Sequence, residues 1–314
     1  MSLACVFPGQ GSQSVGMLAS LSDVHPVFRA TFDEASEVLG YDAWAMTQEG
    51  PAEALNATVN TQPLLLAAGV AVWRTFRALG GPPVSAMAGH SLGEFSALVC
   101  AGSLPFRDSV ELVRQRGRFM QEAVPTGEGA MAAILGLDDS DVEAACREAA
   151  GEGIAVAVNY NSPGQVVIAG DTAAVERAIQ ACKARGAKRA VALPVSVPSH
   201  SPLMQPAADR FRALLADADI RPPETPVYAF DGSLYSGPEP IREGLYRQLF
   251  NPVRWSTIGG HLISMGVRVV IEAGPGKVLA GLMRRLDGGR DLQILAIDGA
   301  EALQAALDAT GKGE

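Results

Sequence analysis

Short apolar runs alternate with stretches of helical periodicity along residues 1–125, and this pattern predicts strands that alternate with helices. Glycine and proline clusters separate the segments and indicate the turns between them. We expect strands at 3–7 and 84–88 and helices at 61–79, 94–102 and 106–123. Strands that are each followed by a helix are typical of a parallel sheet covered by helices.

A different order of elements is predicted between residues 128 and 195. The expected order is strand, helix, strand, strand, helix, strand, at 130–135, 140–149, 154–159, 165–169, 173–184 and 187–193. A turn at 161–164 separates the two middle strands. This βαββαβ order is that of a ferredoxin-like subdomain. The earlier alternation then returns, with helices expected at 202–215, 241–250 and 257–265 and strands at 227–230, 267–272 and 292–297.

The two patterns predict an α/β protein in two parts. A large domain with a parallel sheet core takes residues 1–127 and 196–314, and a ferredoxin-like subdomain is inserted at 128–195. The chain has 314 residues, of which 48% are hydrophobic and 19% charged, so it is long enough to bury a sizeable core.

Charge and cysteine content exclude several classes of partner and compartment. The 25 basic and 34 acidic residues leave a net charge of −9, which disfavours nonspecific binding to nucleic acid or an anionic membrane. The four cysteines form no Cys-x-x-Cys pair, so we expect reduced packing residues. The first residues lack the features of a signal peptide, and no apolar run is long enough to span a bilayer. We therefore expect a cytoplasmic protein.

The segment 89–93, Gly-His-Ser-Leu-Gly, lies between a predicted strand and a predicted helix. In this position it is typical of a nucleophile elbow, in which small flanking residues permit a strained turn that exposes the serine hydroxyl. Ser91 is therefore the candidate nucleophile, and the backbone N–H of Leu92 at the helix start is a candidate oxyanion donor. The alternative is a glycine-rich turn without a catalytic role.

A serine nucleophile needs a base, and the chain has only four histidines. His200 is the best candidate, because Pro198 and Pro202 restrain the loop that carries it. A capping role before the following helix is the alternative for His200. His25 and His261 are expected at the surface, and His90 is expected to point away from its neighbour Ser91.

No acid completes a convincing triad. The carboxylates between Ser91 and His200 that we considered lie near predicted helix starts and are interpreted as caps: Asp138, Asp139, Asp141 and Asp171. A backbone carbonyl can instead fix the imidazole tautomer. Because serine requires a neutral imidazole, we expect activity to fall between pH 8 and 5, as the pH drops through the His200 pKa.

Arg116 lies in the helix that follows the elbow helix, where its planar guanidinium is suited to grip a substrate carboxylate. Arg114 and Arg118 share one exposed helix face, and composition alone does not separate Arg116 from such a basic cluster. The glycine pairs at 9–11 and 274–276 lack the remaining residues of nucleotide-binding motifs. No spacing resembles a metal ligand set, so we predict no metal.

Several segments together resemble the malonyl-CoA:acyl carrier protein transacylases of fatty-acid synthesis. Four of them are 7–13 (Phe-Pro-Gly-Gln-Gly-Ser-Gln), 89–94 (Gly-His-Ser-Leu-Gly-Glu), 198–200 (Pro-Ser-His) and 272–276 (Glu-Ala-Gly-Pro-Gly). Further similar segments lie at 61–63, 116–121, 161–166 and 247–253, so the resemblance covers nearly the whole chain. It implies an α/β-hydrolase-like large domain with a ferredoxin-like insertion, in agreement with the predicted order of elements.

The resemblance also implies a role for individual residues. It makes Ser91 the acyl acceptor, His200 the base and Arg116 the clamp on the malonyl carboxylate. The backbone N–H groups of Gln10 and Leu92 form the oxyanion hole, and the main-chain carbonyl of Gln248 orients the histidine. One departure is the segment 229–232, which reads Ala-Phe-Asp-Gly where the family often has Asn-Val-Asp-Gly.

The implied substrates are malonyl-CoA and acyl carrier protein, with CoA thioester as substrate and no cofactor. Acyl carrier proteins are acidic, so we expect a local basic docking surface. Its candidate residues are Lys183, Lys188, Arg189, Arg284 and Arg285. A monomer is the default expectation. The alternatives are an acyltransferase of polyketide assembly, including one for methylmalonyl groups, a simple serine hydrolase, and a non-catalytic docking subunit.

Overall fold

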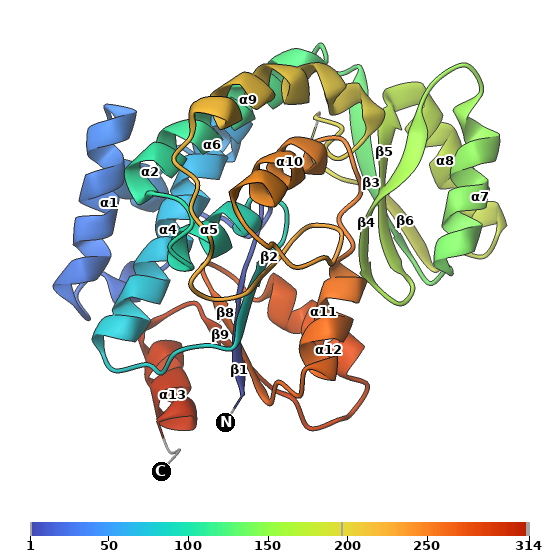
Figure 1. Ribbon diagram of the computed structural model, residues 1–314. Helices are drawn as coiled ribbons and strands as arrows, with labels where there is room; N and C mark the ends of the chain where they lie inside the picture. Colours follow the sequence, from blue (N-terminus) through green and yellow to red (C-terminus); the bar gives the residue numbers. More distant parts are fainter. Residues whose placement is uncertain (1, 196, 312–314) are drawn as a thin grey trace.

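The computed structural model describes residues 2–195 and 197–311, and its centre is a five-stranded parallel sheet (Figure 1). The strand order is β7-β2-β1-β8-β9, and all four neighbouring pairs are parallel. The strands are β1 (Leu3–Phe7), β2 (Ala86–Gly89), β7 (Val227–Tyr228), β8 (Val269–Ala273) and β9 (Gln293–Ile297). Every residue of β1, β2 and β8 is buried, as expected for strands covered on both faces.

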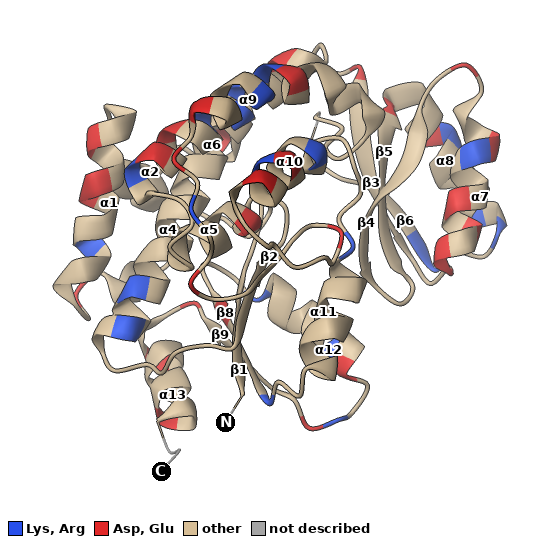
Figure 2. Ribbon diagram, viewed as in Figure 1, with Lys and Arg blue, Asp and Glu red and all other residues tan. Residues whose placement is uncertain are grey.

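Helices surround this sheet, and Figure 2 shows that most of the charge lies on them, whereas the strands are largely uncharged. The helices before the insertion are α1 (Pro26–Leu39), α2 (Ala43–Glu49), α3 (Ala52–Asn56), α4 (Thr58–Ala78), α5 (Gly93–Cys100) and α6 (Phe106–Ala123). Those after it are α9 (Gln205–Asp217), α10 (Pro238–Gln248), α11 (Trp255–Ser264), α12 (Val278–Asp287) and α13 (Ala300–Thr310). A short 3-10 helix precedes α1, η1 (Ala19–Leu21), and another precedes α9, η2 (Pro202–Met204). The predicted alternation of strands and helices is confirmed.

Helix α4 is buried along most of its length, which explains its almost uninterrupted apolar sequence. It begins at Thr58 rather than at the predicted residue 61, so Pro63 lies inside the helix. The additional turn is stabilised by bonds back to α3, because Asn60 donates to the Ala54 carbonyl (3.0 Å) and Thr61 donates to the Leu55 carbonyl (2.6 Å). A prediction of the helix start from capping residues alone does not include these contacts with α3.

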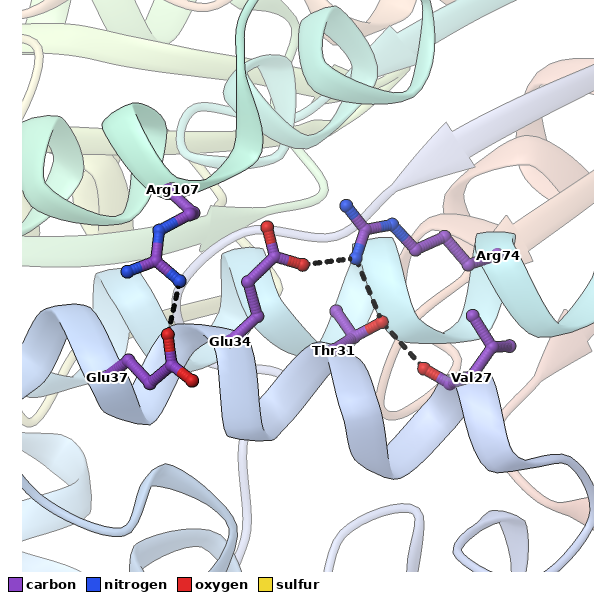
Figure 3. Close-up of polar contacts among 6 residues, drawn as sticks. All are labelled: Val27, Thr31, Glu34, Glu37, Arg74 and Arg107. Atoms are coloured by element: carbon purple, nitrogen blue, oxygen red, sulfur yellow. Dashed lines mark hydrogen bonds and ion pairs between the residues drawn. The ribbon is translucent and has the colours of Figure 1, made fainter.

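Polar contacts hold α1 against α4 and α6 (Figure 3). Arg74 of α4 donates to Glu34 (2.8 Å) and to the Thr31 hydroxyl (3.2 Å) of α1, and Arg107 of α6 pairs with Glu37 at 2.5 Å. Both ion pairs are partly or largely exposed, so they orient the helix more than they stabilise it. The packing energy of α1 comes instead from the buried aromatic residue Phe28 and its neighbours.

A separate antiparallel sheet lies beside the parallel one, with α7 and α8 on its outer side (Figure 1). Its order is β4-β5-β3-β6, and its elements are β3 (Gly129–Leu135), α7 (Asp139–Ala150), β4 (Ala155–Ser162), β5 (Gln165–Asp171), α8 (Thr172–Ala184) and β6 (Arg189–Ala192). The predicted βαββαβ order is confirmed. The predicted turn at 161–164 is too long, because β4 continues through Ser162 and pairs with β5 up to that residue.

The two faces of the antiparallel sheet have different partners. One face packs on α7 and α8 around its own hydrophobic cluster, and the other carries a small cluster of Met131, Val158, Val167 and Ala169. Strand β4 joins the large part through backbone bonds of 2.9 Å from Tyr160 to Val253 and from Val253 to Val158. The second face is therefore available to line a site between the sheets. The domain boundaries themselves stay predictions.

Within residues 2–195 and 197–311, no helix combines the length and the apolar character needed to cross a membrane.

Candidate active site

Ser91 occupies a strained turn between β2 and α5. Its φ of 53° lies in the left-handed region, which side chains other than glycine rarely adopt. A Cβ on Gly89 would lie 1.8 Å from the carbonyl carbon of Gly93, and one on Gly93 would lie 2.0 Å from the Phe7 oxygen. The two glycines of the motif are therefore required by the close approach of the backbone, and the turn has the geometry expected of a nucleophile elbow.

The structure brings His200 and Ser91 together, although 109 residues separate them along the chain. The Nε2 atom of His200 lies 2.8 Å from the Ser91 Oγ, and the His200 Nδ1 lies 2.7 Å from the main-chain oxygen of Gln248. Because a carbonyl only accepts, Nδ1 carries the proton and Nε2 is free to accept from the serine hydroxyl. The carbonyl thus takes the position of the third member of a triad.

The side chains of the remaining histidines form their hydrogen bonds with residues other than Ser91. The His90 Nε2 lies 2.9 Å from the Asn161 Oδ1 on the antiparallel sheet, so His90 joins the two parts of the molecule. His25 caps α1 by accepting from the Val27 N–H, and it is only half exposed. His261 is exposed, as expected.

The four acids considered for a triad all lie in the inserted region rather than beside His200. Asp138 and Asp171 occupy the positions just before α7 and α8, but neither side chain caps its helix. Asp171 instead accepts from the Ile154 N–H at 2.5 Å. Asp138 and Asp171 therefore occupy the predicted N-cap positions, but the predicted hydrogen bonds from their side chains to the helix N–H groups are not formed.

Arg116 is separated by burial from its neighbours in the sequence. It is 1% exposed, donates to the Gln62 Oε1 (2.7 Å) and the Gln248 Oε1 (2.8 Å), and lies 3.5 Å from the Ser91 Oγ. Arg114 and Arg118 instead make partly exposed ion pairs along their own helix. Since a buried guanidinium is costly, its position beside the nucleophile favours a functional role.

The helix that carries Arg116 can approach α4 closely because residue 117 is glycine. A Cβ there would lie 2.7 Å from the Thr58 oxygen. The approach brings Arg116 to Gln62, the one polar side chain in this part of α4 that bonds to it.

A cavity of about 510 Å³ lies in front of Ser91, between the parallel sheet and the antiparallel sheet. Gln10 and Leu92 line it on one side, and Met131 and Val167 of the antiparallel sheet line it on the other. Among the described residues, neither the Gln10 N–H nor the Leu92 N–H donates to a protein acceptor. Both amides are therefore free to bind an oxygen of a ligand.

Sequence reasoning missed four polar side chains around this site. They are Gln62, Glu94, Asn161 and Tyr235. Three of them were already present in the segments that carry the family resemblance, at 61–63, 89–94 and 161–166. A polar residue inside an otherwise apolar helix, such as Gln62, was the available signal.

The pKa of His200 is lowered to about 3, first by burial and then by the positive charge of Arg116. The imidazole of the free protein is therefore neutral throughout the range from pH 8 to 5. The expectation that activity falls within this range required an ordinary histidine pKa, and the burial of His200 beside Arg116 argues against that pKa. The neutral form that a general base requires persists well below pH 5.

The segment 229–232, where the sequence differs from the usual family motif, forms a turn held by backbone hydrogen bonds. The Ala229 N–H donates to the Ser233 oxygen (2.8 Å), the Gly232 N–H donates to the Ala229 oxygen (2.9 Å), and the Phe230 oxygen accepts from Arg254 (2.7 Å). Local hydrogen bonding is thus satisfied without the asparagine.

Metal-binding residues do not gather in the part of the chain that the structure describes: it contains no group of three or more His, Cys, Asp or Glu side chains suited to hold an ion.

Known proteins match the chain over almost its entire length. The acyl transferase domain family matches residues 4–293. The malonyl CoA-acyl carrier protein transacylase of Escherichia coli (strain K12) is 54% identical over 306 residues, 97% of this chain and 98% of that protein. The chain belongs to the acyl transferase family. The protein of the same name from Bacillus subtilis (strain 168) is 44% identical and covers 97% of this chain and 96% of its own length.

Solved structures give the same result for this acyl transferase. The malonyl CoA-acyl carrier protein transacylase of Coxiella burnetii has a TM-score of 0.96 and 48% identity, and covers 98% of each chain. A holo complex of a type II PKS acyl-carrier protein with its malonyl-transacylase has a TM-score of 0.96 and 52% identity, and covers 98% of this chain and 100% of that one. The resemblance inferred from the sequence motifs is confirmed.

We predict that Ser91 of this acyl transferase reacts with an uncharged sulfonyl fluoride at a rate that changes by less than about twofold between pH 8 and 5. The physical reason is that burial and Arg116 keep His200 neutral in this range. Arg116→Ala removes the second cause, so the acid limb of its profile moves to higher pH. A wild-type rate that falls with a midpoint near the ordinary histidine pKa would contradict the prediction.

Proposed function

We propose that this acyl transferase moves the malonyl group from malonyl-CoA to the phosphopantetheine thiol of acyl carrier protein. The observation that carries the proposal is that the imidazole of His200 and the guanidinium of Arg116 both lie next to the hydroxyl of Ser91. The Ser91 Oγ lies 2.8 Å from the His200 Nε2 and 3.5 Å from an Arg116 Nη. A nucleophile with a neutral base beside a carboxylate-binding guanidinium suits a carboxylated acyl donor, and the names of the relatives support it.

The first half of the reaction forms an ester on Ser91. His200 accepts the hydroxyl proton while the Ser91 oxygen attacks the thioester carbonyl of malonyl-CoA. The backbone N–H groups of Gln10 and Leu92 bind the oxyanion, and Arg116 binds the malonyl carboxylate. The carbon–sulfur bond breaks, and CoA thiol leaves with the proton from His200.

The second half reverses these roles with a different thiol. His200 accepts the proton of the phosphopantetheine thiol, whose sulfur attacks the malonyl ester. Ser91 leaves with the proton, and malonyl carrier is released. The Gln248 carbonyl holds the imidazole in one tautomer through both halves, so that the same Nε2 serves each step. No cofactor enters this scheme.

The finer description of the fold belongs to the same proposal. We infer that the large part is α/β-hydrolase-like, and its support is the strand–elbow–helix unit β2–Ser91–α5, in which β2 is an inner strand of a parallel sheet. A monomeric state and a cytoplasmic location stay predictions.

The five basic residues proposed to dock the acidic carrier lie on three different elements, α8, the start of β6 and α12. Arg285 donates to the Gln165 side chain, and Gln165 lines the cavity in front of Ser91. Arg284 is exposed beside it on α12, and Lys188 and Arg189 are exposed at the edge strand β6. Lys183 lies on α8, which packs on the face of the antiparallel sheet turned away from the cavity. The α12 pair is therefore the better supported part of the surface.

Transfer to the carrier of a polyketide synthase is the second candidate function. It is favoured by the similar solved complex that contains a type II PKS acyl-carrier protein. The same Ser91, His200 and Arg116 would serve both carriers.

We expect intact-protein mass spectrometry after brief incubation with malonyl-CoA to show one malonyl adduct. It should be absent in Ser91→Ala and removed by holo acyl carrier protein, because the ester is the intermediate of both halves. Parallel incubations with methylmalonyl-CoA and with carriers of both classes compare the two functions. Preferred methylmalonyl loading would move the protein to polyketide assembly. An adduct on Ser91 that water discharges without carrier would favour a hydrolase, and carrier binding without any adduct would favour a docking subunit.

Arg116→Ala should lower kcat/KM for malonyl loading roughly a hundredfold, because a charge-assisted bond to the carboxylate is lost. Acetyl loading should change much less, so acetyl gains relative to malonyl. Steady-state loading rates with the two donors measure this. Arg114→Ala is the matched control, since Arg114 lies on the same helix but is partly exposed and paired with Glu111. An unchanged preference for malonyl in Arg116→Ala would refute the clamp.

Reversal of the α12 charges in a double variant, Arg284→Glu with Arg285→Glu, should raise KM for acyl carrier protein about tenfold and reduce its dependence on salt. Lys183→Glu changes the net charge in the same direction on the other side of the sheet and should have a smaller effect. Discharge kinetics at two ionic strengths provide the measurement. Equal effects of the two reversals would show a general charge effect instead of a docking surface on α12.

A further inference from the structure

Gln248 links the base to the cation of the site. Its main-chain oxygen accepts from the His200 Nδ1, and its side-chain Oε1 accepts from Arg116 at 2.8 Å. Its side-chain Nε2 donates to the Ser91 carbonyl at 3.0 Å and to the Glu94 Oε2 at 2.8 Å. One residue at the end of α10 therefore contacts the base, the cation and the main chain of the nucleophile.

The chemistry of the neighbours leaves the Gln248 amide only one orientation. Arg116 can only donate, so it must face the amide oxygen. The Ser91 carbonyl and the Glu94 carboxylate accept, so they must face the amide nitrogen. A flipped amide would place donor against donor and acceptor against acceptor. Glu94 thus helps to decide which atom of Gln248 meets the guanidinium.

Glu94 is itself firmly held. It is fully buried in the first turn of α5, and its other oxygen, Oε1, accepts from the Tyr235 hydroxyl. Residue 244 is glycine, and a Cβ there would lie 2.3 Å from that hydroxyl oxygen. The absence of a side chain on α10 therefore makes room for Tyr235 to reach Glu94.

When Glu94 is ionised and the acyl pocket is empty, this network holds one buried anion and one buried cation. In the part of the chain that the structure describes, no carboxylate lies within 4 Å of Arg116. Glu94 is separated from Arg116 by the side-chain amide of Gln248, and its negative charge raises the pKa of Arg116. A malonyl carboxylate beside Arg116 would add a second buried anion to one buried cation, which is costly unless one anion is neutralised.

We propose that Glu94, held by Tyr235, positions Arg116 through the side-chain amide of Gln248 and takes up a proton from solvent when a carboxylated acyl group enters beside Arg116. This inference rests on the proposed function. Glu94 is a positioning residue, since its carboxylate contacts neither the Ser91 hydroxyl nor the acyl group. An acetyl group carries no carboxylate, so its entry leaves Glu94 unchanged.

The groups that face Glu94 place this uptake near neutral pH. The pKa of Glu94 is raised to about 7, because burial and, more weakly, Asp231 raise it by more than the bonds from Tyr235 and Gln248 and the charge of Arg116 lower it. A second anion beside Arg116 cancels that lowering, so the pKa rises when malonate is bound. Proton uptake thus occurs above about pH 7, where Glu94 of the empty site is ionised.

The test is the ratio of kcat/KM for malonyl-CoA to that for acetyl-CoA as a function of pH. The two donors share the CoA phosphates, the nucleophile and the base, so their titrations cancel in the ratio. We expect the wild-type ratio to fall about tenfold between pH 6 and 9, because malonyl loading alone requires the proton. A wild-type ratio independent of pH would overturn the inference.

Two variants and a control assign the slope to Glu94. Glu94→Gln is neutral and similar in shape, and its ratio should be independent of pH. Tyr235→Phe removes the bond that lowers the pKa of Glu94, so the fall should move to higher pH. Tyr228→Phe is the matched control, because the Tyr228 hydroxyl donates to the Met265 Sδ outside the network, and it should keep the wild-type profile. A Tyr235→Phe profile equal to that of wild type would overturn the inference even if Glu94→Gln fails to fold.

Failure of the inference can be told apart from failure of the proposed function. A Ser91 adduct observed by mass spectrometry establishes loading independently of any pH profile. With loading present, a wild-type slope that persists in Glu94→Gln would refute the role of Glu94 alone. A direct readout is proton uptake in weak buffer at pH 8 during one round of loading. Malonyl loading should consume more protons than acetyl loading in the wild type, and equally many in Glu94→Gln.

Discussion

The buried guanidinium of Arg116 is the interaction around which the rest of the site is organised. A cation taken out of water costs several kcal/mol unless its hydrogen bonds and charge are satisfied. Here the partners come from distant parts of the chain: Gln62 of α4, Gln248 of α10 and, through that amide, Glu94 of α5. Each partner is fully or almost fully buried, so the hydrogen bonds made by the two Nη atoms of Arg116 fix the relative positions of four helices, while its buried Nε has no partner among the described residues.

The same arrangement connects recognition to catalysis. Gln248 binds Arg116 with its side chain and His200 with its main chain, so a displacement of the clamp is also a displacement of the base. The charge of Arg116 also contributes to the low pKa of His200, which keeps the imidazole ready to accept a proton. The cation that we propose to hold a substrate carboxylate thus supports the neutral state of the proposed base beside it.

The second sheet supplies the wall of the cavity that the first sheet lacks. Its α7 and α8 face has a core of its own, whereas Met131 and Val167 on the other face line the space in front of Ser91. Backbone bonds at Val253 and the contact between His90 and Asn161 hold the sheet in place beside the elbow. The second sheet therefore lines the candidate site, although Ser91, His200 and Arg116 all lie outside it.

The sequence alone determined those features that depend on neighbouring residues. Apolar periodicity predicted the alternating elements and the βαββαβ insertion, and the glycines on either side of Ser91 predicted the elbow, because both signals act over a few residues. The start of α4 and the length of β4 were misplaced, since bonds to α3 and pairing with β5 decide them.

Only the tertiary structure decided how distant polar side chains meet. The contact between Gln248 and Glu94 joins residues 154 positions apart, and nothing local to either residue indicates it. The charge state of His200 likewise follows from burial and from Arg116, neither of which a sequence displays. Local steric preferences depend on residues that are close in sequence and can be predicted from short segments. Burial and the choice of hydrogen-bond partner depend on residues that come together only when the chain folds.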